Sequence, residues 1–148
     1  MRDYKSTVVD LIESVADMIS EQKSFYNLNL LNIHKYDPIV ISTPSLLIQY
    51  NDKHINREDN SMEINLTLYV LVMGWDREVK NRNIIDYLGR VTALLVDHTP
   101  EGSDLPADNI SEKIDKITIG SESYAGGIIT VSYSTRNIDT LKEFRRYG

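Results

Sequence analysis

The stretch Met62-Glu-Ile-Asn-Leu-Thr-Leu-Tyr-Val-Leu-Val-Met-Gly-Trp75 decides the fold of this chain, because every second residue from Met62 to Val72 is apolar. Successive side chains of a strand point to opposite faces, so these residues line one face of a long strand. The other face starts with Glu63, Asn65 and Thr67 and continues with Tyr69, Leu71 and Met73. We therefore expect an antiparallel strand with one face on a core. We expect its second face to become covered towards the C-terminal end, by the chain itself or by a partner.

The length and composition are those of one globular domain. A chain of 148 residues can bury about two thirds of its unfolded surface. The sequence has no cysteine, which excludes disulfides, thiolate metal sites and cysteine nucleophiles. The net charge of −6 argues against a general nucleic-acid binder, because binding phosphates requires clustered Lys and Arg.

The start of the chain carries no recognisable export signal. No apolar stretch follows Met-Arg-Asp-Tyr-Lys-Ser, and none elsewhere reaches the about 18 residues that a membrane span needs. We expect no membrane association and a protein made and kept in a cytoplasm. The sequons at Asn65 and Asn109 then have no chemical meaning.

Two segments have the spacing of amphipathic helices. The first, predicted over about residues 5–22, has a stripe formed by Val8, Leu11, Ile12, Val15, Met18 and Ile19. The second, over about 80–97, contains Gly89, which suggests close backbone contact with a neighbouring element.

Several shorter segments alternate as strands do. We predict a strand over 39–50 that is an edge strand, or bends or bulges, at Pro44, and an extended hairpin loop over 51–61. Two further strands are predicted, one that begins at Ile117 and one that contains Ile129 to Tyr133. The glycines of Tyr124-Ala-Gly-Gly127 suit a tight hairpin between them. For residues 23–37 a short strand and an extended connection both remain open. The composition of 98–113 indicates an ordered loop or a short turn of helix.

The element order predicts an α+β fold, a mainly antiparallel sheet with two helices packed on one face. We expect a single domain over 1–148, with 136–148 as a basic C-terminal tail. That tail has Arg136, Lys142, Arg145 and Arg146 against Asp139 and Glu143, a balance of 4 − 2 = +2.

The sequence contains no convincing catalytic, cofactor or metal site, and we do not expect an enzyme. His34, His54 and His98 are far apart and belong to no metal-binding signature. The acidic residues of 97–115 do not have the spacing of a calcium loop, so a solvated or interface-facing loop is the better interpretation. They are Asp97, Glu101, Asp104, Asp108, Glu112 and Asp115.

The layout resembles the tail terminator, or tail completion, proteins of long-tailed bacteriophages. The resemblance rests on the acidic first helix, on Asp37-Pro-Ile-Val-Ile41, and on the strand that ends Val70-Leu-Val-Met-Gly74. It is completed by the Ile/Leu-rich helix and by Gly127-Ile-Ile-Thr-Val-Ser-Tyr133. It covers roughly residues 5–135 and is one of architecture and hydrophobic layout, without an invariant motif.

This resemblance implies a homo-hexameric ring on the last ring of the tail tube, in the virion after assembly in the host cytoplasm. The ring stops polymerisation and offers a surface to the head connector, and genomic DNA passes through its lumen without specific binding. A head-to-tail contact that closes generates such a ring.

Several residues are candidates for its contacts with a neighbouring subunit, the tail tube protein or the connector. The extended loop and its base supply Tyr50, His54, Ile55, Arg57 and Glu58. The second face of the long strand supplies Tyr69, Leu71 and Met73, and the 98–115 loop and the tail supply Asp104, Asp108, Arg145 and Arg146.

Two alternatives remain open. Another head–tail connector or neck (head completion) protein would have a related fold. A small ligand-binding or enzymatic α+β domain would instead place His54 or His98 in a pocket beside carboxylates.

Overall fold

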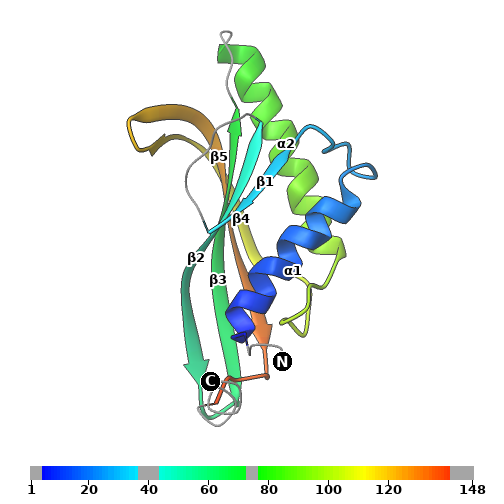
Figure 1. The fold of residues 1–148 in the computed structure, drawn as a ribbon, viewed down its shortest axis with the longest axis vertical. Helices are drawn as coiled ribbons and strands as arrows, with labels where there is room; N and C mark the ends of the chain where they lie inside the picture. The colour runs from blue at the N-terminus through cyan, green and yellow to red at the C-terminus, as the bar shows by residue number, and fades with distance from the viewer. Residues whose placement is uncertain (1–4, 37–43, 73–76, 141–148) are drawn as a thin grey trace.

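The computed structural model describes residues 5–36, 44–72 and 77–140, without the side chains of 77–80. The elements are α1 (Thr7–Gln22), β1 (Asn32–Lys35), β2 (Ser45–Asn56), β3 (Ser61–Val72), α2 (Arg77–Asp97), β4 (Asp108–Ile119) and β5 (Glu122–Thr135). The five strands form one sheet in the order β1-β2-β3-β5-β4. Only the β1–β2 pair is parallel among these neighbours. Both helices lie on the same side of the sheet (Figure 1), which confirms the predicted α+β fold.

Strand β3 lies at the centre of this sheet and carries the core, as its alternation predicts. Met62, Ile64, Leu66, Leu68, Val70 and Val72 are all buried in one cluster with the inner faces of α1 and α2. The apolar stripe of α1 supplies its side of the same core, with Leu11, Val15 and Ile19 fully buried.

Helix α1 begins after a capping serine, Ser6. The Ser6 hydroxyl accepts a hydrogen bond from the Val9 backbone N–H at 3.2 Å, which satisfies one of the free N–H groups at the helix start. A second acceptor comes from far along the chain, because the Asp139 carboxylate accepts hydrogen bonds from the Thr7 N–H and hydroxyl. A carboxylate at this position also complements the helix dipole.

The predicted loop over 51–61 is wrong. Residues 51–56 continue β2 and pair with β3 as far as Asn56 and Ser61, so only 57–60 form a turn. The pairing register shifts between Tyr50 and Asp52, which is a β-bulge beyond Pro44 rather than at it. The first part of the predicted strand, residues 39–43, lies outside the described residues.

The loop predicted after α2 is also shorter than expected, because β4 already begins at Asp108. The remaining loop packs against α1. The Glu101 N–H donates to the Ser14 hydroxyl at 2.7 Å, and a Cβ on Gly102 would lie 3.2 Å from the Leu11 backbone nitrogen. Gly102 also has a φ of +87°, a conformation that residues with a side chain rarely adopt. Both the close contact with α1 and this backbone conformation therefore favour glycine here.

The glycine predictions need two corrections. Gly126 and Gly127 lie inside β5, and the turn between β4 and β5 instead uses Gly120, with a φ of +61°. A Cβ on Gly127 would lie 2.7 Å from Leu88 Cγ of α2, so this glycine lets the helix approach the sheet. The contact expected at Gly89 is absent from the described residues, since no heavy atom lies within 4 Å of a Cβ built there.

Candidate interface on two exposed hairpins

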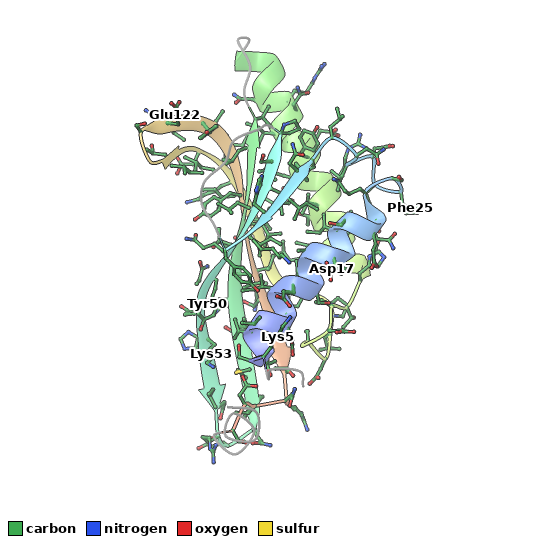
Figure 2. All side chains as sticks on the ribbon, viewed as in Figure 1. Lys5, Asp17, Phe25, Tyr50, Lys53 and Glu122 are labelled. Atoms are coloured by element: carbon green, nitrogen blue, oxygen red, sulfur yellow. The ribbon has the colours of Figure 1, made fainter. Side chains whose placement is uncertain are left out.

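Two hairpins of the sheet each contain a segment in which no side chain is buried. The first, which we call the β2–β3 arm, comprises residues 49–60, every one of which is exposed. The second, the β4–β5 arm, is formed by residues 111–124 around the Gly120 turn. Figure 1 shows the two arms leaving the body in different directions, and Figure 2 places Glu122 at the end of the β4–β5 arm.

The β2–β3 arm gathers most of the predicted contact residues. Tyr50, His54 and Ile55 lie on β2, and Arg57 and Glu58 lie in the turn that follows it. Ile55 is 46% exposed although it is a large apolar side chain. The structure therefore brings these five residues together on one solvent-facing element.

Polar side chains connect the strands at the base of this arm. Asn65 Nδ2 donates to Asp52 Oδ1 at 2.7 Å, and the Ser132 hydroxyl donates to Asn65 Oδ1 at 2.6 Å. Three neighbouring strands are thus linked by one chain of hydrogen bonds. His54 Nε2 lies 3.6 Å from Asp52 Oδ1, and both side chains are mostly exposed.

The second face of β3 is covered at Leu71 by the chain itself, which is one of the two predicted alternatives. Leu71 is completely buried within the chain, so naming it as a partner contact was wrong. Its cover comes from the β4–β5 arm, because Ile117 lies over Gly126, and Leu71 Cδ2 is 3.3 Å from a Cβ built at that glycine. Tyr69 is half-buried, and Met73 lies outside the described residues.

The acidic candidates of the 98–115 segment separate onto different elements. Asp104 belongs to the loop, where its carboxylate accepts a hydrogen bond from the Arg136 N–H at 2.9 Å at the end of β5. Asp108 begins β4 and is exposed. Arg145 and Arg146 lie outside the part of the chain that the structure describes.

The residues that the sequence interpretation missed are Glu112 to Lys116 on β4. All five are exposed, yet they form a regular strand against β5. The pattern that could have indicated them is Glu-Lys-Ile-Asp-Lys, in which charges of opposite sign surround one isoleucine. The prediction of an acidic loop did not use this pattern.

His98 lies in a groove between α1 and the loop after α2. Carboxylates of both elements line it, among them Asp10, Glu13, Asp17 and Glu101. His98 Nδ1 is 3.1 Å from the Leu94 carbonyl oxygen, which engages one ring nitrogen with the helix end. Figure 2 shows Asp17 on the outer side of α1.

Tyr26 and Tyr133, two tyrosines of the described residues, have raised pKa values. Desolvation, together with the hydrogen bond that the Tyr26 hydroxyl donates to Asp97 Oδ2 at 2.8 Å, raises the pKa of Tyr26. Burial raises the pKa of Tyr133, and its hydroxyl has no hydrogen-bond partner among the described residues. Both shifts keep the phenol neutral, so neither creates an acid or base that works near neutral pH.

Across residues 5–36, 44–72 and 77–140, no group of three or more His, Asp or Glu side chains is placed to hold a metal ion. In the same ranges neither helix is both long and apolar enough to cross a membrane.

Compared with known protein families and with curated proteins, the chain matches none of them by sequence.

Proposed function

We propose that this chain is a structural protein of a long-tailed bacteriophage that forms a ring at the head-proximal end of the tail tube. In this role it ends tube polymerisation and provides the surface for head joining. Its partners are further copies of itself in a hexamer, the tail tube protein and a connector or neck protein. DNA passes through the ring, and the net charge of −6 disfavours tight binding of its phosphates.

The observation that carries this proposal is the β2–β3 arm. It is the outer strand and the turn of its hairpin, and none of the side chains of 49–60 is buried, although the neighbouring strand β3 is also paired with β5. β1 pairs with β2 only from Ser45 to Ile48, so the outer edge of 49–56 has no strand beside it among the described residues. An exposed edge with a protruding Ile55 suits strand addition or docking on a neighbouring protein.

The proposal is tested by adding the purified protein to tail tubes assembled from the phage's own tube protein. We expect rings at one end of each tube by negative-stain electron microscopy, and tubes that no longer elongate. Ile55→Asp should reduce the fraction of capped tubes at least about tenfold, because it puts a charge into an apolar contact. Leu30→Asp is the matched control, since Leu30 is 75% exposed but lies far from the arm, in the segment after α1.

Three outcomes contradict the proposal or redirect it. A protein that remains monomeric in the presence of tube ends contradicts the ring. Capping that Ile55→Asp leaves intact would show that the β2–β3 arm is not the contact. Binding to filled heads, with no binding to tails, would favour a neck protein instead.

The groove at His98 favours a second candidate, a binding site for a cationic ligand or a basic peptide. It places a histidine beside carboxylates from two elements, which is the arrangement expected for the ligand-binding alternative. Titration with a lysine-rich peptide should then show binding that Asp17→Asn weakens and that high salt abolishes. Equal binding by the parent chain, Asp17→Asn and His98→Ala would remove this candidate.

A further inference from the structure

We propose that β4 is a self-recognition strand, whose free edge pairs antiparallel with the β4 edge of a second copy about a two-fold axis at Ile114. The result is a dimer with one continuous sheet of both chains. The inference concerns the free protein and does not rest on the proposed function.

The first observation is that the outer edge of β4 is open. β4 ends the sheet, with β5 on its inner side and no strand of the described chain on its outer side. In an antiparallel pair, alternate residues direct both backbone groups away from the partner strand. The Lys116 N–H donates to Oδ1 of the preceding residue, Asp115, at 2.8 Å, so the backbone groups of Lys116 point away from β5. Ile114 and Glu112, two and four positions earlier, point the same way and are called outward residues with Lys116.

The second observation is that the side chains of this edge complement themselves. Antiparallel pairing about Ile114 places Glu112 opposite Lys116 of the other copy and Lys113 opposite Asp115. Ile114 then faces its own counterpart on the axis. Each pair occurs twice by symmetry, so four opposite-charge pairs surround one apolar pair, and directly opposed charges of unlike sign stabilise a sheet.

The neighbouring registers are all worse. Outward residues must pair with outward residues. The two-fold axis therefore lies level with one residue, which faces its own copy, and not midway between two residues of a strand. Moving it by one position puts Lys113 opposite Lys113, or Asp115 opposite Asp115. Moving it by two positions puts Glu112 opposite Glu112, or Lys116 opposite Lys116. Of the five registers centred on residues 112 to 116, only the one at Ile114 avoids a like-charge pair on the axis.

The third observation is that apolar surface lies beside this edge. Ile114 is 41% exposed, and its row of the sheet faces α2, since its partner Gly127 lies beneath Leu88. Thr92 of α2 donates a hydrogen bond to Glu112 Oε2, which places this flank of the helix next to β4. Ile85 and Val96 share the flank, seven residues before Thr92 and four after it, and are 59% and 52% exposed.

The symmetry makes these apolar residues meet. A two-fold axis perpendicular to a continuous sheet keeps both α2 helices on the same side of it. The two flanks then approach each other across the joined edges, and the pair buries Ile114, Ile85 and Val96 of both copies. An open strand edge with charges on both faces normally repels other chains, but here a second copy cancels every one of the four charges.

The test uses charge variants and measures dimerisation by native mass spectrometry over a concentration series. Glu112→Lys with Asp115→Lys turns all four pairs into lysine–lysine pairs, and should raise the dimer dissociation constant at least about 30-fold. The exchanged variant, which adds Lys113→Glu and Lys116→Glu, again complements itself and should recover the dimer. In a mixture it should pair with itself but not with the parent chain, because each mixed pair has like charges.

A crosslink tests the register itself. The chain has no cysteine, so Ile114→Cys introduces one thiol, and on the axis two such residues lie about 5.5 Å apart between Cα atoms, within reach of a disulfide. We expect rapid formation of a covalent dimer under mild oxidation. Ile55→Cys, similarly exposed on the β2–β3 arm, should give little. A parent chain that stays monomeric throughout, an exchanged variant that mixes freely with it, or equal crosslinking at both positions would overturn the pairing. None of these results depends on tail tubes.

Discussion

Strands β3 and β4 have the same length and share the neighbour β5, yet they have opposite surroundings. Both are 12 residues long. β3 buries its whole apolar row beneath the two helices, whereas no residue of β4 is buried. Backbone pairing is therefore enough to form a strand at the edge of an existing sheet. The side chains of β4 contribute little to the core and are available for a partner.

The strongest test of this comparison truncates one apolar residue on each strand. Leu68→Ala on β3 should lower the free energy of unfolding by about 2–5 kcal/mol, because Leu68 is fully buried and the core cannot fill the space. Ile114→Ala on β4 should cost less than about 1 kcal/mol. Urea denaturation followed by circular dichroism measures both, at concentrations low enough for the chain to be monomeric. Equal losses would show that β4 is part of the core.

Two adjacent glycines of β5 test how firmly β4 and α2 are held against the sheet. Gly127→Ala should destabilise by about 1–3 kcal/mol, because its methyl group would push against Leu88 of the fixed helix α2. Gly126→Ala should change stability by less than about 1 kcal/mol, because the methyl group meets the end of Ile117, a side chain on β4 that has room to turn. Thermal unfolding compares the two variants directly, and a larger loss at Gly126 would mean that β4 is as rigidly held as α2.

The smallest expected effect concerns the buried end of β5. Tyr133 pairs with Ile64 of β3 and is fully buried, and no described residue forms a hydrogen bond with its hydroxyl. Tyr133→Phe removes the unsatisfied group while keeping the ring, and should raise the unfolding free energy by about 1 kcal/mol. Tyr69→Phe, at a half-buried tyrosine of β3, is the control and should stay within about 0.5 kcal/mol of the parent. A destabilised Tyr133→Phe would mean that the hydroxyl is bonded in solution.

The candidate contact residues were predictable only in part. The β2–β3 arm was recognised as an exposed segment because 51–61 contains Ile55 as its one apolar residue. Leu71 was misassigned because alternation tells which face a side chain takes, but not what lies on that face. The cover over Leu71 depends on how the β4–β5 arm bends, which is a contact between distant parts of the sequence.

The two helices, the central strand β3 and the placement of the core on one face of the sheet could all be predicted from the sequence. These features follow from burial, and burial leaves a periodic pattern of apolar residues. Three features could be seen only in the tertiary structure. Residues 51–56 and 108–116 are strands, β1 runs parallel to β2, and β4 is an edge strand of the sheet. An exposed strand has no core to bury and leaves no such pattern, so its conformation comes from hydrogen bonds to a neighbour that the local sequence does not contain.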